Sequence, residues 1–138
     1  MSKLIMVDGH DGLARTPSGG IVNINKDEID ETIIGQVLTA GNGQNPARQA
    51  LIKSGIPKEK TAFNINQVCG SGLRAIVLGY QSIGMGSSKF VIAGGQESMS
   101  NSDEKEMLTN GLIDAFNNYH MGVTAENVAE KFNISRDE

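Results

Sequence analysis

The hydrophobic residues of the chain fall into short runs that are separated by polar, glycine-rich stretches. The runs KLIMV at 3–7 and KFVIAGG at 89–95 predict buried strands. ETIIGQVL at 31–38 predicts a further strand, interrupted at Gly35 as a bulge would interrupt it. TAFNIN at 61–66 alternates between polar and apolar residues, which is typical of a half-buried strand.

Two helices are predicted between these strands. Asn45 is a favourable N-cap, Pro46 suits the first helical position, and Gly55 ends the helix. From residue 70 to 85 the apolar positions recur at steps of three and four, which predicts a helix with one strongly apolar face. Those positions are Leu73, Ile76, Val77, Tyr80 and Ile83. Strands and helices therefore alternate, and this order predicts a layered α/β fold.

The pattern changes after residue 102. We expect residues 1–102 to form the α/β core and residues 103–138 to form a shorter, separate region. Within that region, TAENVAEKF at 124–132 predicts a short helix. The last four residues, SRDE at 135–138, have the spacing of a capping box and predict the start of one more helix.

Composition narrows the possible partners and compartments. The chain of 138 residues has 12 basic and 16 acidic residues, a net charge of −4 and no basic stripe, so we expect no nucleic-acid partner. Its apolar runs are too short to span a membrane, and the N-terminus does not resemble a signal peptide. A single cysteine cannot form an internal disulfide, which favours a reducing, cytoplasmic location.

The single cysteine, Cys69, is the first candidate for chemistry. It lies in NQVCGSGLRA at 66–75, where the predicted strand gives way to the predicted helix. The N-terminus of a helix favours an anion, and its free N–H groups can hold an oxyanion. Gly70 and Gly72 leave room for a substrate. The alternative is that Cys69 is an inert, small hydrophobic residue, and from the residues alone both interpretations stay open.

The sequence gives little support for a cysteine–histidine pair, a metal site, a serine hydrolase site or a dinucleotide-binding loop. A cysteine nucleophile needs a base, and only His10 and His120 could supply an imidazole; a surface role for His10 and a half-buried structural role for His120 are the alternatives. No residue spacing resembles a metal site. The sequence around Ser71 lacks the G-x-S-x-G spacing of serine hydrolases, and GNG at 41–43 lacks the third glycine of a dinucleotide-binding loop.

Four blocks together resemble the N-terminal half of the thiolase family, in its acetoacetyl-CoA (acetyl-CoA acetyltransferase) subgroup. They are GNGQNPARQA at 41–50, NQVCGSGLRA at 66–75, AGGQESMS at 93–100 and YHMGVTAENVAE at 119–130. ARTPSGG at 14–20 resembles a further family loop. The resemblance implies the thiolase-like layered α/β/α fold, of which this chain would be the N-terminal half with part of the substrate-loop region.

The resemblance also implies a reaction and a site. Cys69 would be the nucleophile that carries an acetyl group as a thioester, in the condensation of two acetyl-CoA molecules or the thiolysis of acetoacetyl-CoA. Leu112, His120 and Met121 would line the acyl and pantetheine pocket. Coenzyme A thioesters would be the substrates, no cofactor would be needed, and the activity would belong to fatty acid metabolism. A homo-oligomer or a complementary thiolase half would be the protein partner.

The chain also departs from the family. Thiolases have a second half that supplies the activating histidine and a second cysteine, and no such segment occurs in this sequence. The region before residue 26 and the substrate loop are shorter than in the family. We therefore expect a C-terminally truncated chain with an exposed apolar face that is inactive without a C-terminal half. The alternatives are a non-catalytic remnant that binds acyl-CoA or a thiolase subunit, and a degraded product without function.

Overall fold

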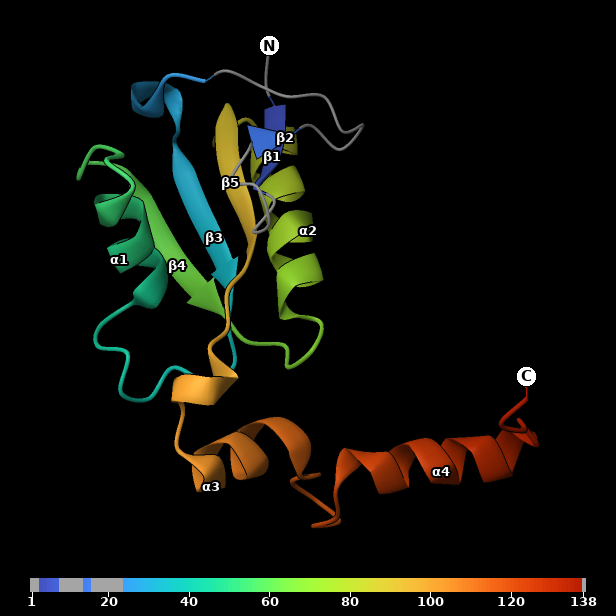
Figure 1. Cartoon of the computed structure of the whole chain (residues 1–138). Coiled ribbons are helices and arrows are strands. Elements are labelled where there is room, and N and C mark those ends of the chain that lie inside the picture. The colour runs from blue at the N-terminus through green and yellow to red at the C-terminus, as the bar shows by residue number, and fades with distance from the viewer. Residues whose placement is uncertain (1–2, 8–13, 16–23, 138) are drawn as a thin grey trace. The chain divides into compact units, whose positions relative to one another are not determined.

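The computed structural model describes residues 3–7, 14–15 and 24–137 (Figure 1). The predicted loop around His10 and residues 16–20 of the ARTPSGG motif lie outside the described residues. The chain divides into two compact units, Met1–Glu97 and Ser98–Glu138, and each is described by itself.

The first unit is built on a five-stranded sheet in the order β2-β1-β5-β3-β4. The strands are β1 (Lys3–Val7), β2 (Ala14–Arg15), β3 (Glu31–Gly35), β4 (Thr61–Ile65) and β5 (Phe90–Gly95). β2 is antiparallel to β1, and the other pairs are parallel. The four predicted strands are confirmed. The bulge at Gly35 is wrong, because Gly35 is the last residue of β3 and remains in register with Ile65 and Gly95.

Helices cover both faces of this sheet, which confirms the layered α/β fold. α1 (Pro46–Lys53) packs on β3 and β4, and α2 (Ser71–Gly84) packs on β5, β3 and β1 (Figure 1). Successive strand residues point to opposite faces. Val91 and Ala93 therefore pack with Ala75 of α2, whereas Ile92 packs with Leu51 of α1.

The start of α1 is fixed to the edge strand β4, as the capping residues predict. The Asn45 side chain accepts a hydrogen bond from the Arg48 N–H at 2.9 Å and donates one to the Ala62 carbonyl at 2.9 Å. The Arg48 guanidinium donates to the carbonyl groups of Lys58 and Lys60. These bonds occupy carbonyl groups on and beside an edge strand that would otherwise be open to pairing with another chain.

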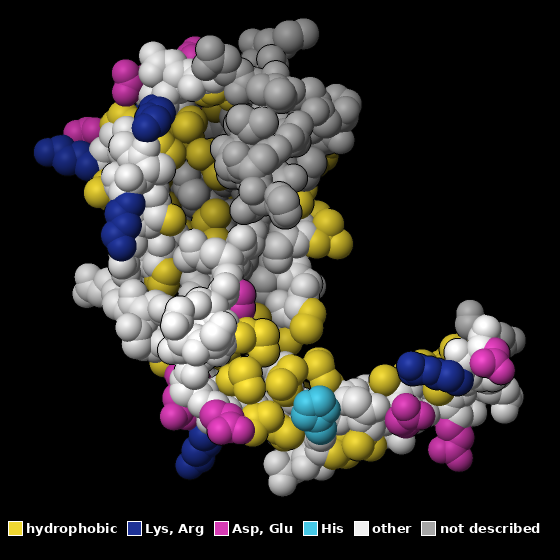
Figure 2. Space-filling view, in the orientation of Figure 1, with side chains coloured by type: hydrophobic (Ala, Val, Ile, Leu, Met, Phe, Trp, Pro, Cys, Tyr) yellow, Lys and Arg dark blue, Asp and Glu magenta, His cyan; other side chains and the backbone are white. Residues whose placement is uncertain are grey.

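The apolar face predicted for α2 is only partly buried, because Ile76 and Ile83 pack against the core whereas its other three residues are exposed. The buried face carries the small residues Ser71, Ala75 and Gly79. Leu73 and Tyr80 are 69% and 70% exposed, and Val77, between them on the same face, is also exposed. Figure 2 shows hydrophobic side chains at the surface of the chain.

The first turn of α2 touches the backbone of the sheet directly. A Cβ atom placed on Gly35 would lie 2.4 Å from the carbonyl carbon of Ser71 and 2.5 Å from the nitrogen of Gly72. A Cβ on Gly95 would lie 3.6 Å from the Cα of Gly72. The three glycines therefore let the helix approach the ends of β3 and β5 closely.

At the opposite end of these strands, Asp30 joins β3 to β5. Its Oδ2 accepts hydrogen bonds from the N–H groups of Lys89 (2.7 Å) and Phe90 (3.1 Å), and Lys60 lies 3.6 Å from Oδ1. The pKa of Asp30 is lowered, first by the hydrogen bond from the Lys89 N–H and then by the hydrogen bond from the Phe90 N–H and the charge of Lys60. Burial of the carboxylate opposes this shift.

The second unit is helical. It contains the short 3-10 helix η2 (Met99–Asn101), α3 (Glu104–Met107), the π-helical turn η3 (Leu108–Leu112) and α4 (Met121–Phe132). α4 confirms the predicted helix and begins three residues earlier than the predicted start at 124. Residues 135–137 form no helix, and the rest of the predicted C-terminal helix lies outside the described residues. No helix in the described part of the chain is long and apolar enough to cross a bilayer.

We predict that Gly35→Ala lowers the free energy of unfolding by about 1–3 kcal/mol, because the new methyl group must push the backbone of α2 away from β3. Urea unfolding followed by circular dichroism measures this. Gly84→Ala is the matched control, since a Cβ there meets nothing within 4 Å and should leave stability unchanged or slightly raised. Equal stabilities of the Gly35→Ala variant and the wild type would contradict the close contact.

We also predict that Asp30→Asn lowers the free energy of unfolding at pH 7 by about 1 kcal/mol, through the loss of charged hydrogen bonds. The folded-state pKa of Asp30 is below its ordinary value of 3.8, so this stabilisation is present above that value and is lost as the pH falls through the folded-state pKa. The gap between variant and wild type should therefore close below about pH 4. Asp27→Asn, at an exposed neighbouring carboxylate, is the control, and a gap independent of pH would contradict the assignment.

Candidate functional site

Cys69 lies in the five-residue turn, residues 66–70, that connects β4 to α2 in the first unit. The described part of the chain holds this one cysteine, and its thiol is free and exposed. Gly70 is the N-cap of α2 and offers no side chain to the N–H groups of the first helical turn. The N–H groups of Gly70 and Ser71 donate to the carbonyl groups of Gln67 (3.1 Å) and Val68 (3.0 Å), so these two are used within the turn itself.

The turn before Cys69 is held in an unusual conformation. Val68 has φ of +49°, which is strained for a β-branched residue. The Asn66 side chain accepts a hydrogen bond from the Val68 N–H at 2.9 Å. The buried Ser71 hydroxyl accepts one from the Gln67 N–H at 2.8 Å and donates one to the Val68 carbonyl at 2.6 Å. The thiol therefore follows a turn whose backbone is fixed from both sides.

A polar network joins the ends of the strands beneath this turn, and sequence reasoning missed it. The Gln36 Oε1 accepts hydrogen bonds from the side-chain amides of Asn64 (3.2 Å) and Gln96 (2.8 Å). The Glu97 carboxylate accepts from the N–H groups of Val37 (2.9 Å) and Leu38 (3.1 Å). The available signal was the presence of polar residues at the ends of three predicted strands, where parallel strands place them together.

In the second unit the structure brings Leu112, His120 and Met121 together. Ile113, next to Leu112, forms an isolated antiparallel bridge with His120, and the intervening loop closes around Asp114. Leu112 is partly buried, whereas the other two are exposed. The Asp114 carboxylate accepts from the N–H groups of Asn117 (2.6 Å) and Phe116 (2.9 Å), and these bonds lower its pKa. Cys69 belongs to the other unit.

His120 has a structural function in this unit. It is the N-cap of α4, and its Nδ1 accepts a hydrogen bond from the Gly122 N–H at 3.0 Å. Nδ1 must therefore be unprotonated, which leaves Nε2 with the ring proton. A histidine whose Nδ1 is occupied in this way can still offer Nε2 to a ligand.

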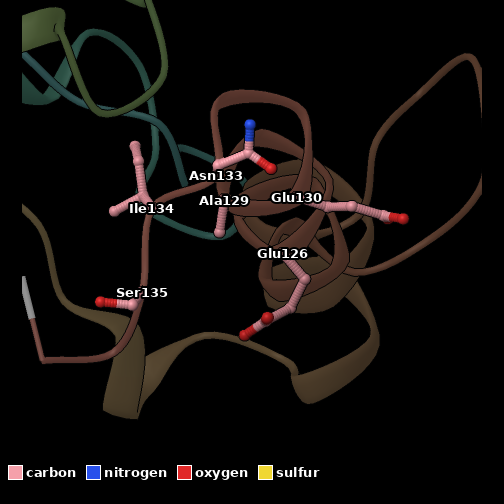
Figure 3. Close-up of a pocket in the computed structure, with 6 residues that line it drawn as sticks. All are labelled: Glu126, Ala129, Glu130, Asn133, Ile134 and Ser135. Carbon is pink, nitrogen blue, oxygen red and sulfur yellow. The ribbon is translucent and has the colours of Figure 1, made fainter.

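Hollows among the described residues include two that Cys69 does not line. One, of about 560 Å³, lies at the end of α4 (Figure 3). It is lined by Glu126, Ala129, Glu130, Asn133, Ile134 and Ser135. The other, of about 280 Å³, is a mainly apolar groove between α1 and the sheet, with Thr32 on its wall. No cluster of potential metal ligands is present in the described parts of the chain.

The family is decided by comparison with known proteins. The model of the thiolase N-terminal domain matches residues 19–138. The chain belongs to the thiolase family. The resemblance carried by the four sequence blocks is thereby confirmed.

Individual thiolase relatives agree with this assignment. An acetyl-CoA acetyltransferase of Rhizobium meliloti is 54% identical over 127 residues, which cover 80% of this chain and 32% of the relative. One from Paracoccus denitrificans is 53% identical over 131 residues, covering 83% and 34%. The crystal structure of the Acat5 thiolase from Ascaris suum in complex with coenzyme A matches with a TM-score of 0.76 and 38% identity, over 83% of this chain and 34% of that one. The chain thus spans about a third of the length of these proteins.

We predict that His120→Ala weakens the first turn of α4 by about 1 kcal/mol, because the Gly122 N–H loses its acceptor. Amide hydrogen exchange at Gly122 and Val123 measures this locally. His120→Asn is the matched control, since an Asn side chain is a favourable N-cap and should preserve slow exchange. Identical exchange in the wild type and the Ala variant would show that the imidazole does not cap the helix.

Proposed function

We propose that this chain is the cysteine-bearing part of an acetyl-CoA acetyltransferase. The Cys69 sulfur attacks the carbonyl carbon of acetyl-CoA, and the coenzyme A thiol leaves as the acetyl–cysteine thioester forms. A second acetyl-CoA, deprotonated at its methyl carbon, then attacks this thioester, which yields acetoacetyl-CoA and frees Cys69. Thiolysis is the reverse. The observation that carries the proposal is the exposed thiol at the start of α2, in a chain about half identical to proteins named acetyl-CoA acetyltransferase.

The geometry of the turn supports the thioester step. A developing oxyanion on the acetyl group can accept hydrogen bonds from backbone N–H groups at the N-terminus of α2. Gly70, directly after Cys69, adds no side chain beside the thiol, so a thioester can approach. The dipole of a helix of 14 residues favours negative charge at this end.

The substrate site extends the proposal to the second unit. We assign Leu112, His120 and Met121 to the wall of the acyl and pantetheine pocket, because the structure gathers them at the start of α4. Coenzyme A thioesters are the proposed substrates, without a further cofactor, and a solved thiolase neighbour is described in complex with coenzyme A. We place the reaction in fatty acid metabolism in the cytoplasm.

The base that the reaction needs is not identified within the described residues. His120 is their one imidazole, and its Nδ1 caps α4. Since a positioned general base typically contributes about 10²- to 10⁴-fold, we expect these 138 residues alone to turn over slowly. We propose that a complementary thiolase half or a second copy of the chain supplies the remainder.

A second candidate function is binding without catalysis. The exposed Leu73, Val77 and Tyr80 form one stripe on the outer side of α2, and such a stripe favours contact with another protein surface. In this alternative, the chain binds acyl-CoA or a thiolase subunit and Cys69 stays unmodified.

We predict that incubation with acetyl-CoA adds one acetyl group to the chain, and that Cys69→Ala abolishes this adduct. Intact-mass spectrometry measures the adduct, and peptide mapping locates it. Iodoacetamide is the control for accessibility, since it alkylates an exposed thiolate without the need to position a thioester.

The three possible results separate the two functions. An adduct at Cys69 supports the acetyl-transfer function. An alkylated but never acetylated Cys69 contradicts it and favours the binding function, which equilibrium binding of coenzyme A then checks. An adduct retained in Cys69→Ala places the acetyl group on another side chain and also contradicts the proposal.

A further inference from the structure

We propose that the Ser71 hydroxyl is the group that positions Cys69 for acyl transfer, a role that rests on the function proposed above. Ser71 does not touch the substrate in this proposal. It acts through the backbone of the three residues that precede Gly70.

The Ser71 hydroxyl group makes two hydrogen bonds to this backbone. It is 4% exposed, and it uses both its acceptor and its donor on the same short segment. It accepts from the Gln67 N–H at 2.8 Å and donates to the Val68 carbonyl at 2.6 Å. These two groups flank Val68, the residue directly before Cys69. The two bonds therefore fix the backbone conformation directly before Cys69.

The segment needs such a restraint because Val68 is strained. A valine at φ of +49° costs free energy that the surrounding contacts must offset. Without the hydroxyl, Val68 can relax toward negative φ, and this rotation would turn the following Cys69 away from the N-terminus of α2. A displacement of about 1 Å at a reacting atom can cost about 10²-fold in rate.

Ser71 itself is anchored by the sheet. Its carbonyl carbon is the atom that lies closest to the Cβ position of Gly35, and its backbone N–H donates to the Val68 carbonyl at 3.0 Å. The restraint on Cys69 is therefore transmitted from β3, which lies between β5 and β4 in the sheet. A serine on a helix that could shift would not transmit such a restraint.

The test uses the 138-residue chain and compares two rates at Cys69: acetylation by acetyl-CoA and alkylation by iodoacetamide. We expect Ser71→Ala to lower acetylation by about 10- to 100-fold and to lower alkylation much less, because alkylation needs an exposed thiolate but no oriented acyl group beside the backbone N–H groups. Adding Val68→Gly should restore part of the acetylation, since glycine adopts positive φ without strain.

Ser82→Ala is the matched control. Ser82 lies on the same helix, is partly buried, and hydrogen-bonds Glu31 at 3.0 Å and Ser88 at 2.9 Å, away from the turn. We expect this variant to keep the acetylation rate of the wild type. A second readout is amide exchange at Gln67, which should become faster in Ser71→Ala and not in Ser82→Ala.

Each other result overturns a defined part of the proposal. An unchanged ratio of acetylation to alkylation in Ser71→Ala, or equal losses in the two serine variants, overturns the positioning role. Unchanged exchange at Gln67 overturns the restraint on the turn, even if the wild type is never acetylated. A wild type that is alkylated but not acetylated overturns the acetyl-transfer function itself, whereas loss of acetylation in Ser71→Ala alone leaves that function standing.

Discussion

The direct contact between the first turn of α2 and the ends of β3 and β5 is the constraint on which the first unit depends. Gly35, Gly72 and Gly95 meet there with no side chain between them, and a single added methyl group at Gly35 would overlap the backbone of the helix. The distance between the helix and the sheet is therefore fixed at this point, because close packing leaves no room for a larger residue. Because α2 begins at this point, the turn that carries Cys69 is fixed at the carboxyl edge of the parallel strands, where α/β proteins commonly bind ligands.

Hydrogen bonds between polar groups also hold the loops at this carboxyl edge of the sheet together. Where β3 ends, its backbone leaves the sheet, and its N–H and carbonyl groups need new partners. Glu97 supplies acceptors to Val37 and Leu38, and the N–H of Gln96 donates to the Gly35 carbonyl at 2.9 Å. The loops after β3 and β5, which are far apart in the sequence, are therefore held as neighbours. These hydrogen bonds limit movement of the strand ends against which α2 rests.

Local signals in the sequence were sufficient where local chemistry decides the structure, and not elsewhere. Asn45 and Pro46 predicted the start of α1 because capping depends on neighbouring residues. Periodicity predicted α2 but not its full orientation, since the small residues Ala75 and Gly79 are its most buried positions while large apolar residues lie on both its inner and its outer side. Gly35 within a run of strand residues fits a bulge or a close backbone approach equally well, and only the position of α2 distinguishes them. Nothing in the sequence marks Val68 for positive φ, because β-branched residues rarely adopt it. Whether Leu112, His120 and Met121 line a pocket with Cys69 remains a prediction.

The exposure of the outer side of α2 affects how strongly this helix can stabilise negative charge on a thioester at Cys69. Leu73, Val77 and Tyr80 lie at the spacing of a stripe that packs against another element, and all three are exposed in the described structure. Backbone dipoles stabilise a developing charge much more strongly where water is excluded than where it is present. In the described structure the thiol of Cys69 is exposed to solvent. Covering the outer stripe would therefore raise the electrostatic contribution of α2 without changing any residue of the turn. A complementary surface could in this way increase the reactivity of Cys69 in addition to supplying a base.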